Sequence, residues 1–146
     1  MTAEPGDLIA RESPVVLVVE DDPDLRRFYH MIFTVCGFRT EQADNGFQAL
    51  EKATQSLPDL ILTDIAIPGI DGIELCRRLR ADTRTRSIPV LAVTGHLDRG
   101  YLDRAMKAGA DSVMVKPCAA ETLVAEARRL LARTPTSGDI LRPARL

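Results

Sequence analysis

Short hydrophobic runs alternate with longer amphipathic stretches along the chain, five times in succession. The first run, Val15–Val19, is continuous and rich in β-branched residues, which is typical of a strand buried on both faces of a parallel sheet. Apolar residues at helical spacing follow over 23–36, and Gly37 ends that stretch. We therefore predict a strand and then a helix, with Asp22 as the N-cap and Pro23 in the first turn. The residues predicted to face inward are Leu25, Phe28, Tyr29, Ile32, Phe33 and Cys36.

The same unit of one strand and one helix recurs four more times. The further strands are predicted at 38–42, 60–63, 89–93 and Ser112–Val115. Their helices begin at Asn45, at Asp71, near Asp98 and shortly after Pro117. Asp71 and Glu74 have the spacing of a capping box, and Gly109 closes the helix that starts near Asp98. The residues predicted to face inward on these helices are Ala49, Leu50, Ala53, Leu57, Ile73, Cys76, Leu79, Leu123, Val124, Ala127, Leu130 and Leu131.

Five alternations of strand and helix predict an α/β fold, with a parallel sheet covered by helices on both faces. The chain has 146 residues, enough for one domain with a complete core. We expect that domain to span 14–132. The polar segments 1–13 and 133–146, which contain Pro and Gly, are predicted to be a flexible arm and a flexible tail.

Polar side chains stand where the predicted strands end. Glu20 and Asp21 follow the first strand, Asp64 the third, Thr94 the fourth and Lys116 the fifth. In doubly wound sheets the ligand crevice lies beyond the carboxyl ends of the strands, so we expect these side chains to meet. Carboxylates brought close together repel unless a cation joins them, and oxygen ligands favour Mg²⁺. A lysine and a hydroxyl beside them suit phosphoryl transfer with an aspartate as nucleophile.

Composition narrows the class of protein. The net charge of −2 gives no electrostatic reason to expect a nucleic-acid or membrane surface. The apolar runs are shorter than the roughly 20 residues of a membrane span, and the first residues do not resemble a secretion signal. Cys36, Cys76 and Cys118 form no CxxC motif, which favours free thiols in a cytoplasmic protein.

Each candidate residue also has a plainer interpretation. An acidic residue at a strand end is usually a helix cap or a solvated loop residue, and Thr94 could be an ordinary strand terminus. Cys118 is expected to be a small core residue. The arginine-rich stretch 77–86 is expected to be a solvated surface. Lys116, however, is one of three lysines among nineteen basic residues, which suits a site that needs a point charge.

Five short motifs, in this order and spacing, resemble the receiver domains of response regulators in two-component signalling. They are Val-Val-Glu-Asp-Asp at 18–22, Asp-Leu-Ile-Leu-Thr-Asp at 59–64 with Pro-Gly at 68–69, Val-Thr-Gly at 93–95, Ala-Gly-Ala at 108–110 and Val-Lys-Pro at 115–117. The resemblance covers nearly the whole chain. It implies a flavodoxin-like sheet with strand order 2-1-3-4-5.

The resemblance also implies roles for single residues. Asp64 would accept a phosphoryl group from a histidine kinase or a histidine phosphotransfer protein. Asp21 would ligate Mg²⁺ directly, Glu20 through a metal-bound water, and the Ala66 carbonyl would complete the protein ligands. Mn²⁺ is expected to substitute for Mg²⁺.

Lys116 would pair with the phosphoryl group, and Thr94 would bind one of its oxygens. The bond between Lys116 and Pro117 is a candidate cis peptide.

One position departs from the family pattern. Many receivers carry Tyr or Phe where this chain has Val113, and that ring moves with the threonine. We therefore expect beryllofluoride with Mg²⁺ to shift resonances of 94–106 more than those of the last strand. Gly95, His96 and Val113 are candidate modulating residues, and His96 is expected to affect dephosphorylation.

The expected function is a stand-alone receiver that catalyses only its own phosphorylation and dephosphorylation. It would signal to an unidentified protein, pass the phosphoryl group onward, or form a homodimer through the last two helices and the last strand. Tyr101, Leu102 and Met106 are the expected apolar contacts of that dimer. No nucleic-acid or membrane partner is expected.

Three alternative functions make different demands on the sequence. A phosphatase of the haloacid dehalogenase type needs a second aspartate where Ala66 stands. The glycine motifs of nucleotide-binding proteins are absent from the sequence. A receiver fold that acts as an adaptor without phosphorylation stays open, because Val113 removes the usual aromatic residue.

Overall fold

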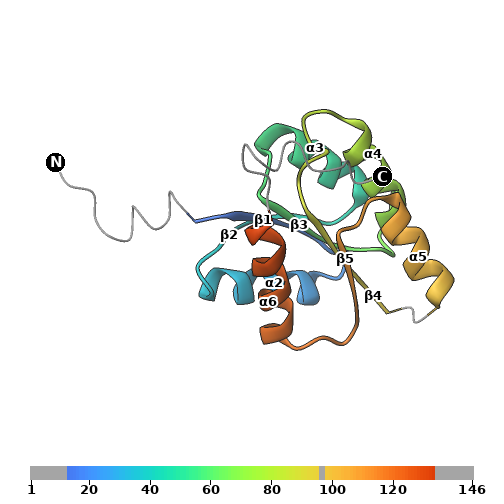
Figure 1. Ribbon diagram of the computed structural model, residues 1–146. Helices are drawn as coiled ribbons and strands as arrows, with labels where there is room; N and C mark the ends of the chain where they lie inside the picture. The colour runs from blue at the N-terminus through green and yellow to red at the C-terminus, as the bar shows by residue number, and fades with distance from the viewer. Residues whose placement is uncertain (1–12, 96–97, 134–146) are drawn as a thin grey trace.

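The computed structural model describes residues 13–95 and 98–133, and within them the chain forms a five-stranded parallel sheet between two layers of helices (Figure 1). The strands are β1 (Val15–Val19), β2 (Arg39–Ala43), β3 (Leu60–Asp64), β4 (Val90–Thr94) and β5 (Ser112–Val115). The helices are α2 (Pro23–Val35), α3 (Gly46–Ser56), α4 (Gly72–Ala81), α5 (Arg99–Ala108) and α6 (Ala120–Ala132). The strand order β2-β1-β3-β4-β5 confirms the predicted flavodoxin-like topology. The predicted arm and tail fall almost entirely outside the described residues.

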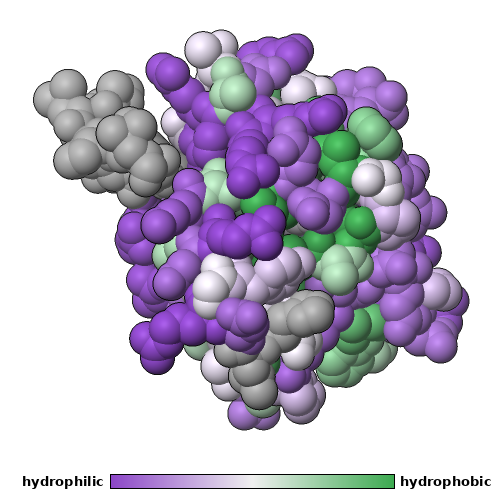
Figure 2. Space-filling view, turned by 90° about the vertical axis from the view of Figure 1, so that its right-hand side faces the viewer, coloured by the Kyte–Doolittle hydropathy of each residue, from purple (hydrophilic) through white to green (hydrophobic). Residues whose placement is uncertain are grey.

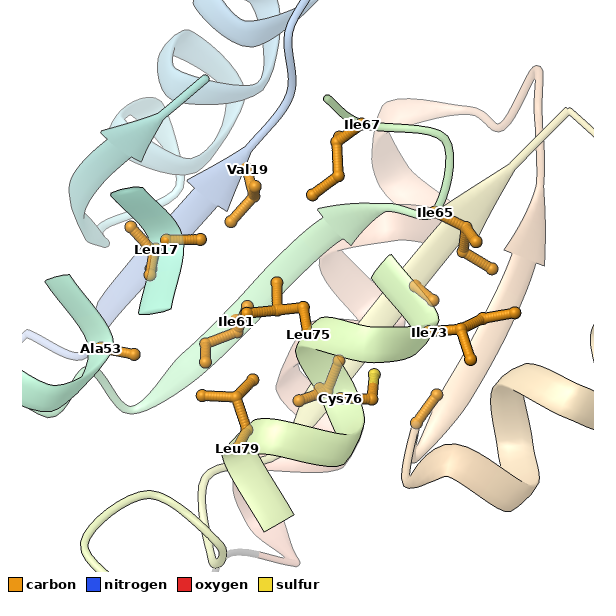
Figure 3. Packing of buried hydrophobic residues seen from close by; sticks show 14 of the residues in the cluster. Leu17, Val19, Ala53, Ile61, Ile65, Ile67, Ile73, Leu75, Cys76 and Leu79 are labelled. Atoms are coloured by element: carbon orange, nitrogen blue, oxygen red, sulfur yellow. The ribbon is translucent and has the colours of Figure 1, made fainter. Parts of the chain in front are cut away.

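The sheet has one hydrophobic cluster on each face, because alternate residues of a strand point to opposite sides. Leu17 and Val19 of β1 face the cluster covered by α3, α4 and α5, whereas Val16 and Val18 face the one covered by α2 and α6. Figure 3 shows α4 directing its apolar side chains toward β3 in the first cluster. A Leu or Ile side chain buried in this way stabilises the fold by about 1.5–3 kcal/mol.

Most predicted inward-facing positions are confirmed, but Phe28 and Leu57 are not. Phe28 is 43% exposed because it lies beside, rather than on, the stripe of α2 that contains the buried Tyr29 and Phe33. Leu57 is 52% exposed because it is the C-cap of α3, with a left-handed φ of 48°. β2 and β4 each begin one residue later than predicted, while Phe38 is still buried.

Arg80 contradicts the prediction that the stretch 77–86 is solvated throughout. Its guanidinium Nη2 lies 2.8 Å from Asp111 Oδ2, and the two side chains are 11% and 5% exposed. The pair joins α4 to the loop before β5, at the end of the sheet where the strands begin. Other arginines in this stretch, such as Arg77 and Arg84, are exposed as predicted.

The predicted helix caps are confirmed. Asp22, Asn45, Asp71 and Asp98 each accept a hydrogen bond from a backbone amide in the first turn of the helix that follows. Among the described helices, none has the length and apolar character of a membrane span.

Candidate functional site

The parallel strands bring the predicted site residues to one edge of the sheet. Glu20 directly follows β1, Asp64 and Thr94 end β3 and β4, and Lys116 directly follows β5. The backbone amide of Lys116 donates to the Thr94 carbonyl at 2.7 Å, which fixes the end of β5 against β4. The meeting of polar side chains that was expected from the strand ends is therefore present in the fold.

Lys116 is at the centre of this group. Its Nζ donates to Asp64 Oδ2 at 2.8 Å and to Glu20 Oε1 at 3.0 Å. The side chains of Glu20 and Asp64 are only 2% and 11% exposed, so both contacts are largely shielded from water. Hydrogen bonds between charged partners in such surroundings are roughly twice as strong as neutral ones.

Electrostatics keeps the lysine charged. Burial alone would lower the pKa of Lys116, but the hydrogen bonds and charges of Asp64 and Glu20 outweigh it and raise that pKa. Burial raises the pKa of Glu20, and the Asp22 amide and Lys116 offset part of this rise. The site therefore holds a fixed positive charge next to Asp64.

Backbone groups orient the two carboxylates. Asp64 Oδ1 accepts a hydrogen bond from the Ala66 amide at 3.1 Å, which leaves Oδ2 to Lys116. Glu20 Oε2 accepts one from the Asp22 amide at 3.1 Å. Arg26 Nη1 donates to the Glu20 carbonyl at 2.8 Å and so ties α2 to this edge.

Three carboxylates at this edge could hold a cation. Glu20, Asp21 and Asp64 can each offer one oxygen, and these oxygens all lie within 4.8 Å of one another. One lysine against three carboxylates leaves an excess of two negative charges, which matches a divalent cation. Hard oxygen ligands of this kind suit Mg²⁺, so the residues fit the metal. The Ala66 carbonyl as a further ligand stays a prediction.

Gly72 supports the site, and the sequence reasoning missed it. Its amide donates to the Ile65 carbonyl at 2.8 Å, so that the start of α4 lies against the end of β3. A Cβ at this position would lie 2.6 Å from Ile65 Cα and 2.8 Å from the Asp64 carbonyl oxygen. The available signal was a glycine in the first turn of a helix, where it otherwise lowers helix propensity.

Thr94 and the candidate modulating residues Gly95, His96 and Val113 differ in their surroundings. Thr94 is fully buried, whereas Gly95 is exposed and a Cβ added there would meet nothing within 4 Å. Val113 is half-buried and pairs with Ala92 in the sheet. His96 lies outside the described residues. The predicted cis peptide between Lys116 and Pro117 is confirmed.

Comparison with known proteins agrees with this geometry. A family model for the response regulator receiver domain matches residues 16–128. The DNA-binding dual master transcriptional regulator RpaA of Synechocystis sp. is 36% identical over 121 residues, which are 83% of this chain and 50% of that protein. The chain thus spans about half the length of the curated relatives it matches.

Solved structures show the same fold. A putative response regulator from Chloroflexus aurantiacus is 30% identical, with a TM-score of 0.79 over 83% of this chain and 99% of that one. The receiver domain of sensor histidine kinase PA1611 from Pseudomonas aeruginosa is 29% identical, with a TM-score of 0.73. The match covers 84% of this chain and 97% of that one. That crystal structure has a magnesium ion coordinated in its active site cleft. The chain belongs to the response regulator receiver domain family.

Proposed function

We propose that this chain is a phospho-acceptor switch, in which Asp64 takes a phosphoryl group from a phosphohistidine of a histidine kinase or a histidine phosphotransfer protein. The observation that carries the proposal is the position of Lys116, which donates to both Asp64 and Glu20 where three carboxylates converge. Membership of the receiver family supports a histidine kinase as the donor.

The transfer needs few groups. An Asp64 carboxylate oxygen attacks the phosphorus, so that an O–P bond forms while the N–P bond of phosphohistidine breaks, and the imidazole leaves with the bonding electron pair. The Ala66 amide and Lys116 hold the carboxylate in place before the attack. Lys116 then balances charge on the phosphoryl group, and the Thr94 hydroxyl donates to one of its oxygens.

Asp21 and Asp64 would hold Mg²⁺ directly, Glu20 through a water, and Ala66 through its carbonyl. When bound, the metal neutralises charge on phosphoryl oxygens. The excess of negative charge at the site and the magnesium ion in the related PA1611 receiver support this assignment. The same oxygen ligands also suit Mn²⁺.

We assign the chain a signalling role and not that of an enzyme with a separate substrate. Its phosphorylated form would act on a protein partner or pass the phosphoryl group to a relay protein in the cytoplasm. The free thiols of Cys36, Cys76 and Cys118 agree with a reducing compartment. RpaA is named as DNA-binding, so duplex DNA is the competing partner to be tested with the phosphorylated chain.

A homodimer through α5, β5 and α6 would be a further output. Figure 2 shows hydrophobic surface among hydrophilic side chains on the side of the molecule that carries α5. Met106 on this helix is 45% exposed, and Tyr101 and Leu102 are half-buried. Sedimentation velocity with and without beryllofluoride measures whether phosphorylation changes the mass of the assembly.

Intact mass spectrometry tests the phospho-acceptor role. The chain is incubated with acetyl phosphate, with and without Mg²⁺, and we expect a gain of one phosphate that needs the metal. Asp64→Asn should lose this gain. Asp24→Asn is the matched control, because the Asp24 side chain is 90% exposed and its contact with Arg27, at 3.7 Å, is long and exposed.

No gain of mass in the wild-type chain would reject the proposal and favour an adaptor that works without phosphorylation. An equal gain in Asp64→Asn would reject Asp64 as the acceptor. Consumption of acetyl phosphate by Asp64→Asn at the wild-type rate would instead indicate a phosphatase activity that does not pass through Asp64.

A further inference from the structure

The loop between β3 and α4 follows directly on the proposed acceptor and includes Ala66. Three of its residues, each at most 8% exposed, are buried in the cluster under α3, α4 and α5: Ile65, Ile67 and Ile70. Figure 3 shows Ile65 and Ile67 among the side chains of that cluster. Pro68 and Gly69 are exposed instead, so the buried side chains hold only the inner side of the loop.

The first turn of α3 lies against the exposed part of the same loop. The Gly46 amide donates to the Pro68 carbonyl at 3.0 Å. A Cβ at Gly46 would lie 2.1 Å from the Ile70 carbonyl oxygen, so the backbones of α3 and the loop are in direct contact. A Cβ at Gly69 would lie 2.9 Å from Cδ2 of Phe47, which places the Phe47 ring over Gly69.

The Phe47 ring also lies close to α4. The guanidinium carbon of Arg78 is 5.9 Å from the centroid of this ring, at the distance of a cation–π contact. Nε of Arg78 donates to Glu74 Oε2 at 3.1 Å, which holds the guanidinium on the surface of α4. The ring is 57% exposed, so its contacts are with the loop and with α4 more than with the core.

The loop positions a group of the proposed metal site. The Ala66 amide donates to Asp64 Oδ1 at 3.1 Å, and the Ala66 carbonyl is a predicted ligand. When only a fraction of the molecules has a ligand in place, the apparent affinity falls by that fraction. Contacts that keep the loop against α3 therefore strengthen metal binding without touching the metal.

We propose that Phe47 is a positioning residue of the metal site. Its ring lies over Gly69, keeps the loop against α3 and so keeps the Ala66 carbonyl in place for Mg²⁺. The inference rests on the proposed function, since it needs Mg²⁺ to bind at this edge of the sheet. A single exposed phenylalanine is otherwise an ordinary surface feature, and its loss would then leave metal binding unchanged.

Titration of the full, unphosphorylated chain with MgCl₂, followed by amide NMR, tests this proposal. We expect Phe47→Ala to raise the Kd for Mg²⁺ by about three- to tenfold, which corresponds to a loop in place in about a third to a tenth of the molecules. Phe47→Tyr keeps the ring and should have the wild-type Kd. Phe28→Ala is the matched control, because Phe28 is also an exposed ring, at 43%, but lies on α2, which covers the other face of the sheet.

Hydrogen exchange of the Gly46 amide in the metal-free chain is the second readout. This amide donates to Pro68, so its exchange reports directly whether the loop leaves α3. We expect faster exchange in Phe47→Ala than in the wild type, and wild-type exchange in Phe47→Tyr and Phe28→Ala.

A wild-type Kd or a wild-type rate of Gly46 exchange in Phe47→Ala would overturn the inference and leave the proposed function intact. It would also be overturned if Phe47→Tyr bound Mg²⁺ as weakly as Phe47→Ala, or if Phe28→Ala lost as much affinity. Absence of Mg²⁺ binding in the wild-type chain would overturn the proposed metal site and the inference together.

Discussion

Replacing Arg80 by methionine tests what holds together the end of the sheet opposite the site. Nε and Nη2 of Arg80 donate to the Gly109 carbonyl at 3.0 and 2.7 Å, and Nη1 donates to the Arg86 and Ile88 carbonyls at 3.1 and 2.7 Å. Nη2 also donates to Asp111 Oδ2 at 2.8 Å. One side chain thus joins α4, the loop before β4 and the loop before β5.

Methionine keeps an unbranched side chain with good helix propensity, but it removes every one of these donors. Asp111 would keep the Val90 amide as a partner, while its carboxylate, 5% exposed, would lose the charge that compensates it. Removal of one partner of a buried ion pair costs about 3–5 kcal/mol. At about 2–4 °C for each kcal/mol in a domain of this size, the melting temperature should fall by roughly 6–20 °C.

Urea and thermal denaturation followed by circular dichroism measure this loss. Arg84→Met is the matched control, because the ion pair of Arg84 with Asp82 is in the same stretch but its side chains are 64% and 26% exposed. We expect little change in stability for that control. A loss in Arg80→Met no greater than in Arg84→Met would refute the reasoning.

Three further variants address the site and the edge of the domain. Gly72→Ala should cost about 1–3 kcal/mol of stability and slow the gain of phosphate from acetyl phosphate, because the added Cβ would lie 2.8 Å from the Asp64 carbonyl oxygen. A wild-type stability together with a wild-type rate of phosphorylation would contradict this. Lys116→Met should abolish the gain of phosphate seen by intact mass, since Asp64 loses its cation; a wild-type gain would speak against the role of Lys116. A hydrogen bond from Arg129 lowers the pKa of Glu126 from 4.5 to about 2. The ionised Glu126 carboxylate therefore contributes to stability above about pH 4.5, and this contribution is lost as the pH falls through about 2. In acid denaturation, Glu126→Gln should reduce this loss by about 1 kcal/mol or less, because Arg129 is half exposed; an unchanged acid profile would contradict it.

The architecture and the proposed site could be predicted from the sequence because both depend on local signals. A continuous apolar run such as Val15–Val19 predicts a buried strand without knowledge of its neighbours. Once the strands are parallel, the residues that follow them must share one edge, so Glu20, Asp64 and Lys116 are expected to meet. The structure adds the hydrogen bonds through which Lys116 joins the two carboxylates.

Features that depend on side-chain packing between separate elements, and not on where the strands end, could not be predicted. Arg80 looks like its exposed neighbours in the sequence, and only the folded chain brings Asp111 to it. The close approach of Gly72 to the end of β3 likewise follows from packing between two elements. Tyr101 was expected at a dimer surface, whereas its packing against the core depends on how α5 lies on β5.

Localising the phosphoryl group within the chain tests the central claim most directly. The wild-type chain is phosphorylated with acetyl phosphate and Mg²⁺, digested under conditions that preserve acyl phosphates, and mapped by tandem mass spectrometry. We predict a single phosphoryl group, on Asp64. A phosphoryl group on any other residue, or none at all, would contradict the claim that Asp64 is the acceptor at this edge of the sheet.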